Sequence, residues 1–308
     1  MSVTTSIERI GAMRCGVGES PVWHAREHAL YWTDIPGRVL WRWDASSDRT
    51  HAWALPEMAG SLALIDEGGV ALAMETGIFV MEHPVPDAPI AMRECLATVA
   101  HRSGGMRFND GRCDRQGRFL AGTMVCDTTL ARTEGRLYRL NVERRSLHVL
   151  CDELIVPNGL AFSPDGRTMY LSDSHASRRI VWSFDYDIDD GVPYGRRVFI
   201  EMGEALGLGR PDGAAVDADG CYWICGNDAG LVHRFTPEGK LERCIAVPAA
   251  KPAMCAFGGA GLDTLFVTSI RLEGDALSGA TFAVEVGVKG LPEPMLRLPI
   301  GVSGGGGK

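Results

Sequence analysis

His28-Ala-Leu-Tyr-Trp-Thr-Asp34 is a short segment in which aromatic, aliphatic and β-branched residues form an apolar run. Runs of this length and composition are typical of buried β-strands. Similar segments follow along the chain at residues 69–75, 117–124, 167–173, 220–226 and 263–269. Six comparable strands indicate a fold that is built from repeats.

Each of these segments is predicted to be the second strand of its repeat. Acidic, glycine-containing turns precede several of them, and such turns favour β-hairpins. First strands are predicted to begin near residues 21, 62, 111, 159, 213 and 256, at intervals of 41, 49, 48, 54 and 43 residues. Third strands are predicted at residues 37–44, 77–82, 135–141, 180–185, 230–236 and 280–286.

A period of roughly 40–50 residues predicts an all-β, six-bladed β-propeller with four antiparallel strands in each blade. Residues 1–300 are expected to form this single domain, and residues 7–12 to close the ring by adding a strand to the last blade. The Gly-rich tail, residues 301–308, is expected to be disordered. A large β-sandwich is the alternative, but it does not require a regular spacing. No amphipathic helix interrupts the pattern, which disfavours a βαβ architecture.

Composition limits the partners and the compartment. The 308 residues carry a net charge of -8, with a pI near 5.5, and no basic cluster that would bind nucleic acid. Residues 1–16 lack the apolar core of a secretory signal, and no apolar run is long enough to cross a membrane. Nine unpaired, irregularly spaced cysteines argue against disulfides. We therefore expect a cytoplasmic protein with reduced thiols, and no pattern predicts an obligate protein partner.

Polar residues recur just before the predicted first strands, which line the central channel of a propeller. The positions are Glu19, Gly60-Ser61, Asn109, Asn158, Asp212 and Met254-Cys255, so that four of the six offer carboxylate or amide oxygens. Taken singly, Asn-Gly and Asp-Gly pairs are ordinary turn sequences. Taken together, two carboxylates and two amides would meet at one end of the channel, where a dication would offset the repulsion between the carboxylates.

Carboxylate and amide oxygens suit Ca²⁺, Mg²⁺ or Mn²⁺, and ligand type leaves Zn²⁺ and Fe²⁺ open. An ion with open positions can polarise a carbonyl and activate water, which is the chemistry of ester and lactone hydrolysis. The sequence contains no Gly-x-Ser-x-Gly elbow and no phosphate-binding Gly loop. Arg107, two residues before Asn109, would lie near the channel mouth, where it either contacts a sugar or is simply solvated.

The motifs that carry these residues resemble the SMP-30/gluconolactonase/regucalcin-like family. They are Gly18-Glu-Ser-Pro-Val-Trp23, Arg107-Phe-Asn-Asp-Gly111, Ala121-Gly-Thr-Met124, Pro157-Asn-Gly-Leu160 and Pro211-Asp-Gly213, and the resemblance covers roughly residues 8–300. It implies a metal-dependent sugar lactonase, a carboxylic-ester hydrolase that opens a pentono- or hexonolactone to the sugar acid.

The resemblance also assigns roles to individual residues. It implies Glu19, Asn158 and Asp212 as ligands of one divalent metal ion on the channel axis, with Asp212 as general base toward a metal-activated water, and Arg107 and Asn109 as substrate contacts. Regucalcin-like members supply a Glu from the loop after Ala121-Gly-Thr-Met124, whereas this chain has the shorter Asp127. Some relatives on this fold hydrolyse organophosphates. A non-catalytic calcium-binding or interaction propeller is the other alternative, because the fold also serves as a binding platform.

Overall fold

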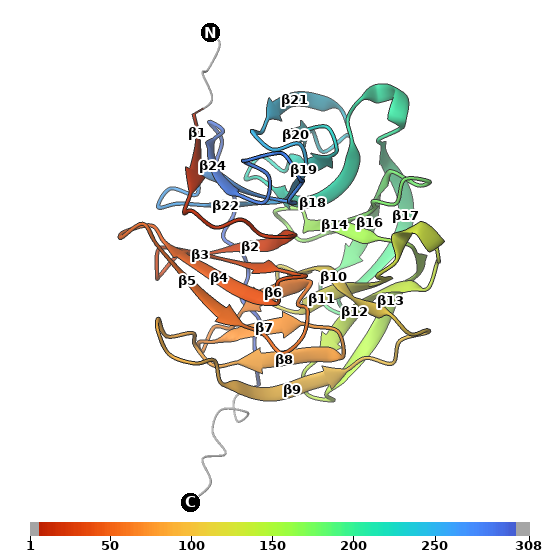
Figure 1. Cartoon of the computed structure of the whole chain (residues 1–308). Helices are drawn as coiled ribbons and strands as arrows, with labels where there is room; N and C mark the ends of the chain where they lie inside the picture. The colour runs from red at the N-terminus through yellow and green to blue at the C-terminus, as the bar shows by residue number, and fades with distance from the viewer. Residues whose placement is uncertain (1–5, 300–308) are drawn as a thin grey trace, which may run out of the picture.

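The computed structural model describes residues 6–299, so the predicted tail at 301–308 lies outside the described residues. Six four-stranded antiparallel sheets are arranged as the blades of a propeller (Figure 1). The predicted fold class and the number of blades are confirmed. The described residues contain two 3₁₀ helices, η1 (Thr128–Leu130) and η2 (Glu204–Leu206), and no α-helix.

In blades 1 to 5 the strands follow in chain order from the channel outward. Blade 1 contains β2 (Gly18–His24), β3 (Ala29–Asp34), β4 (Val39–Asp44) and β5 (Arg49–Ala54); blade 2 contains β6 (Ser61–Leu64), β7 (Val70–Ala73), β8 (Gly77–Met81) and β9 (Met92–Thr98); blade 3 contains β10 (Met106–Cys113), β11 (Phe119–Val125), β12 (Gly135–Asn141) and β13 (Ser146–Leu154).

Blades 4 and 5 repeat this order, whereas blade 6 takes its outermost strand from the start of the chain. Blade 4 contains β14 (Pro157–Phe162), β15 (Thr168–Asp173), β16 (Ile180–Asp187) and β17 (Val192–Glu201); blade 5 contains β18 (Arg210–Val216), β19 (Tyr222–Asn227), β20 (Leu231–Phe235) and β21 (Leu241–Ala246); blade 6 contains β22 (Pro252–Gly258), β23 (Thr264–Ser269), β24 (Thr281–Glu285) and β1 (Ile7–Ile10).

The ring closes as the sequence predicts. β1 pairs antiparallel with β24, with Ile7 opposite Val284, so the outer strand of blade 6 comes from the start of the chain (Figure 1). Buried clusters fill the spaces between neighbouring blades; between blades 6 and 1, Trp23 stacks on Phe266 with ring centroids 5.5 Å apart. Because apolar side chains cover both faces of most inner strands, these strands are buried along almost their whole length.

The inner strands begin at one end of the channel, which we call the upper end. Near their first residues these strands are irregular. In five of the six blades the pairing between first and second strand shifts register there: between Glu19 and Val22, Phe108 and Gly111, Asn158 and Ala161, Pro211 and Ala214, and Pro252 and Cys255. Only the β6–β7 pair of blade 2 runs without a shift. A bulge of this kind redirects the adjacent side chains.

Two glycines make this geometry possible. Gly159 has a φ of +59°, and a Cβ there would lie 2.6 Å from the Tyr222 hydroxyl oxygen. A Cβ on Gly213 would lie 2.3 Å from Cγ of Met254 in the next blade. A side chain at either position would therefore push neighbouring inner strands apart.

The segment after β24 crosses the opposite, lower end of the inner strands, from blade 5 to blade 2. This crossing segment, residues 288–297, pairs through Gly290 with Asp217 in blade 5 and through Leu296 with Ile65 in blade 2. The Leu296 side chain is 1% exposed, within the core between blades 2 and 3. Within this segment, Glu293 and Pro294 line a small enclosed space together with Arg112 of β10.

Candidate functional site

The upper end of the channel gathers the four oxygen-bearing residues that the sequence singled out. Glu19, Asn109, Asn158 and Asp212 are 6%, 5%, 3% and 6% exposed, and they come from blades 1, 3, 4 and 5. Each lies within or beside the register shift of its inner strand. Blade 2, which has no shift, contributes only Gly60 and Ser61 at the equivalent place.

Asp212 lies at the centre of a hydrogen-bond network. Its Oδ1 accepts a hydrogen bond from Nδ2 of Asn158, and its Oδ2 accepts one from Nδ2 of Asn227 at 2.5 Å. Asn158 Nδ2 also donates to Oγ of Ser174 at 3.2 Å. Burial raises the pKa of the Asp212 carboxyl to about 7, although the Asn227 hydrogen bond and Arg210 oppose that rise.

Four buried oxygens at this end have no hydrogen-bond partner among residues 6–299: Oε2 of Glu19, Oδ1 of Asn158, Oδ1 of Asp110 and Oγ of Ser61. Burial raises the pKa of Glu19 well above its ordinary value, and the neighbouring carboxylates of Asp212 and Asp110 raise it further. Buried polar atoms are normally paired in native proteins, so unpaired oxygens beside a carboxylate point to a missing cationic partner.

The chemistry of this donor set fits a divalent ion. Glu19, Asn158 and Asp212 present two carboxylates and one amide oxygen, which are hard ligands, and Asn109 offers a second amide nearby. No group of three His, Cys, Asp or Glu that could hold a metal occurs within residues 6–299. A metal site among these residues would therefore have only two acidic ligands, Glu19 and Asp212. The amide oxygen of Asn158 would be its third ligand.

Arg107 and Asn109 lie together beside this set. Nη1 of Arg107 donates to Oδ1 of Asn109 and to the Phe108 carbonyl oxygen, both at 2.8 Å. Nδ2 of Asn109 donates to the Pro157 carbonyl oxygen at 3.0 Å, which ties blade 3 to the strand that carries Asn158. Cys126, an exposed residue, lies beside Arg107.

The carboxylate of Asp127 makes its hydrogen bonds with its own turn and not with Arg107 or Asn109. It is exposed and serves as the N-cap of η1, where its Oδ1 accepts hydrogen bonds from the Thr129 nitrogen at 3.1 Å and hydroxyl at 2.6 Å. The residue beside Arg107 is its neighbour Cys126. The shorter side chain stays with its own turn, since an aspartate caps the following helical turn readily.

Sequence reasoning missed three residues at this end: Asp110, Asn227 and Ser174. Asn109-Asp110-Gly111 has the composition of a turn, but Asp110 is a buried carboxylate inside the β10 bulge. Asn227 and Ser174 lie at or just after the ends of second strands, and antiparallel pairing returns those ends to the start of the first strand. Asn227 and Ser174 could have been found from the sequence by pairing each predicted first strand with its second strand.

Comparison with known protein families identifies the family to which this propeller belongs. The sequence model of the SMP-30/Gluconolactonase/LRE-like region matches residues 17–271, which span all four oxygen-bearing positions. The chain belongs to the SMP-30/gluconolactonase family. The resemblance seen in the motifs is thereby confirmed.

Relatives in this SMP-30/gluconolactonase family match over most of the chain. A 6-deoxy-6-sulfogluconolactonase of Pseudomonas putida is 39% identical over 286 residues, covering 91% of this chain and 94% of its own length. Regucalcin of Gallus gallus is 32% identical over 305 residues, covering 94% and 97%. The crystal structure of a calcium-binding regucalcin from Agrobacterium tumefaciens superposes with a TM-score of 0.86 at 28% identity, covering 94% and 97%.

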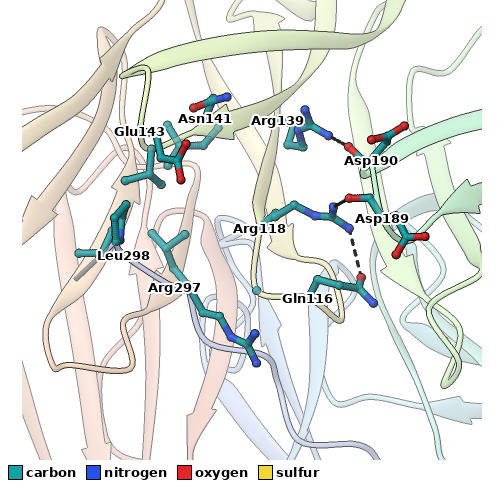
Figure 2. Close-up of a pocket in the computed structure, with 14 residues that line it drawn as sticks. Gln116, Arg118, Arg139, Asn141, Glu143, Asp189, Asp190, Arg297 and Leu298 are labelled. Atoms are coloured by element: carbon teal, nitrogen blue, oxygen red, sulfur yellow. Dashed lines mark hydrogen bonds between the residues drawn. The ribbon is translucent and has the colours of Figure 1, made fainter. Parts of the chain in front are cut away.

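A hollow of about 460 Å³ lies at the other end of blades 3 and 4 (Figure 2). Arg118 donates to the Asp189 carbonyl oxygen at 2.8 Å, and Arg139 donates to the Asp190 carbonyl oxygen. Arg118 follows the turn that ends β10, whereas Arg107 and Asn109 lie at the start of that strand. Both guanidinium groups already donate to backbone carbonyl oxygens. Because the hollow lies at the opposite end of β10 from Arg107 and Asn109, it is separate from these motif residues.

Two further observations concern the whole described chain. No helix within residues 6–299 is long and apolar enough to cross a membrane. All nine cysteines are free, and Cys221 and Cys225 are buried.

Proposed function

We propose that this protein is a metal-dependent hydrolase that opens an aldonolactone, a pentono- or hexonolactone, to its sugar acid. The observation that carries the proposal is the pair of unpartnered buried oxygens, Glu19 Oε2 and Asn158 Oδ1, beside the Asp212 carboxylate. Family membership and the 39% identity to a sulfogluconolactonase support a lactone as the substrate class.

Glu19, Asn158 and Asp212 would hold one divalent ion. When bound, the ion supplies Lewis-acid polarisation of the lactone carbonyl. Asp212 would take the proton from the attacking water molecule, because its buried carboxylate lies among the residues that would hold the ion. The all-oxygen donors favour Ca²⁺, Mg²⁺ or Mn²⁺, while Zn²⁺ and Fe²⁺ are also compatible with carboxylate and amide ligands.

Arg107, Asn109 and Asp127 would bind the sugar. Arg107 and Asn109 are already fixed to one another at 2.8 Å, so both would meet a substrate in a preset orientation. Asp127 would act only at the rim, because Oδ1 is used in capping η1, and Oδ2 makes no hydrogen bond within residues 6–299 and can take a sugar hydroxyl.

We further propose that the protein works in the cytoplasm on a small-molecule substrate, without nucleic acid, membrane or an obligate protein partner. Nine free thiols fit a reducing compartment. The net charge of -8 disfavours nucleic acid as a partner.

Acid release from a panel of pentono- and hexonolactones, followed with a pH indicator, tests the proposal. The metal-free protein is loaded in turn with Ca²⁺, Mg²⁺, Mn²⁺, Zn²⁺ and Fe²⁺, and the chelated protein is the control. We expect turnover of at least one lactone that chelation abolishes. Tight ion binding without turnover of any lactone would favour the alternative, a non-catalytic calcium-binding propeller, which the calcium-binding regucalcin relative supports.

A further inference from the structure

Asp110 is a buried carboxylate that lies outside the proposed ligand set. It is 4% exposed and follows Asn109 inside the β10 bulge. Its Oδ2 accepts a hydrogen bond from the Leu160 nitrogen, two residues after Asn158, at 2.8 Å. Its Oδ1 has no hydrogen-bond partner within residues 6–299. One oxygen therefore fixes the strand that carries Asn158, and the other is left unsatisfied.

The Asp110 carboxylate lies next to the strands that carry the proposed site. It directly follows Asn109 in β10, and the Leu160 nitrogen that it binds lies two residues after Asn158 in the neighbouring blade. Like Glu19 and Asn158, Asp110 carries a buried oxygen without a hydrogen-bond partner in the described part of the chain. Burial raises the pKa of Asp110 itself. Three buried acidic groups at one end of a channel favour a dication more strongly than two do.

A fixed cation lies beneath Asp110 along the same strand. Arg112 is 8% exposed; its Nη1 donates to Oε2 of Glu293 at 3.0 Å, and its Nη2 donates to the Ala214 carbonyl oxygen at 2.7 Å. Glu293 belongs to the crossing segment at the lower end. Arg112 lowers the pKa of Asp110, whereas Glu293 raises it, so both charges act on the Asp110 carboxyl.

We propose that Asp110 is a positioning residue of the metal site, where its free Oδ1 strengthens ion binding through its charge, and that Arg112, held by Glu293, weakens it. This inference rests on the proposed function, because it requires an ion at Glu19, Asn158 and Asp212. Asp110 is not itself a ligand in this proposal and takes no proton from the substrate. The crossing segment then sets the ion affinity of a site at the other end of the channel.

A purely structural role for Asp110 makes a different prediction. If Asp110 only fixed the Leu160 nitrogen, a neutral acceptor of the same size would replace it. Asp110→Asn keeps an oxygen for that hydrogen bond but removes the charge, and it turns an NH₂ group toward the channel. The two roles are therefore separable with one substitution.

The test measures ion affinity by titration calorimetry on the full-length, metal-free protein, with Ca²⁺ and Mn²⁺ as probes. For Asp110→Asn we expect binding about 10- to 100-fold weaker than in the wild type, the range typical of residues that support metal ligands. At saturating ion, its lactonase turnover should recover. Asp114→Asn is the matched control, since Asp114 is a fully buried carboxylate just after the same strand, paired with Arg118 at 2.6 Å. It should lower thermal stability but leave the ion affinity unchanged.

Arg112→Gln gives an independent readout of the opposite sign. It should bind the ion more tightly than the wild type, because a neighbouring positive charge is removed. Unchanged affinity in Asp110→Asn, or unchanged or weaker affinity in Arg112→Gln, would overturn the inference while leaving the proposed function standing. Low turnover of Asp110→Asn at saturating ion would also overturn it, by making Asp110 a catalytic group. A wild-type protein that binds no ion would instead refute the metal site on which both depend.

Discussion

Replacing Asp212 by asparagine separates ion binding from proton transfer. The carboxylate accepts one amide hydrogen bond on each oxygen, from Asn158 and Asn227. An asparagine has only one acceptor oxygen, so one of these amides must turn over or lose its partner. An unsatisfied buried donor costs about 1–3 kcal/mol, and removing a buried charge offsets part of that cost, so the fold should persist.

The rate should change far more than the stability. Loss of a general base typically costs about 10²- to 10⁴-fold, which corresponds to about 2.7–5.4 kcal/mol in the activation barrier. The assay is acid release from the best lactone at saturating ion, with ion affinity measured in parallel and expected to fall only partially. Asp217→Asn is the control, because Asp217 is a fully buried carboxylate just after the same strand, bound to Arg234 at 2.8 Å. It should lose stability but retain its rate at saturating ion.

A wild-type rate in ion-saturated Asp212→Asn would refute the assignment of Asp212 as the base. The Lewis-acid contribution of the ion would survive that result. A rate that recovers only as the ion concentration rises would show that the substitution acts through affinity alone.

Other parts of the structure give four further predictions. Arg107→Ala should raise KM more than it lowers kcat in steady-state assays, because its contacts with the sugar are expected to be similar in the ground and transition states; a fall in kcat alone would contradict this. Chelation should lower the unfolding temperature, and restoring the ion to 100 times its Kd should add about 2.7 kcal/mol of stability; equal melting with and without ion would argue against the site. His233 is fully buried, and burial lowers its pKa, so its contribution to stability is complete above the unfolded-state pKa near 6.5 and declines below it. Urea unfolding should therefore show wild-type stability falling relative to His233→Gln between pH 7.5 and pH 5.5, by at most about 1.4 kcal/mol per pH unit; parallel profiles would exclude His233 as the cause. Thiol titration under denaturing, non-reducing conditions should recover all nine thiols, and a much lower count would contradict the expected reducing compartment.

The repeat and the register of the inner strands could be predicted from the order of residues along the chain. The runs that form β3, β7, β11, β15, β19 and β23 are local signals, since strand propensity and turn residues act over a few positions. Because every blade repeats one plan, the register of one inner strand predicts that of the others. The placement of Glu19, Asn109, Asn158 and Asp212 at one end of the channel therefore follows from periodicity alone.

What these residues touch depends on tertiary contacts. The contact of Asp212 with Asn227 depends on the register shift in β18, and that of Asp110 with Leu160 joins two blades. Arg112 and Glu293 are 181 positions apart, so no local pattern connects them. Asp127 has the spacing of a substrate contact, yet a hydrogen bond to Thr129, two residues away, keeps it on its own turn. Periodicity specifies which face a side chain takes, whereas its partners are fixed only when bulges and blade packing bring distant segments into contact.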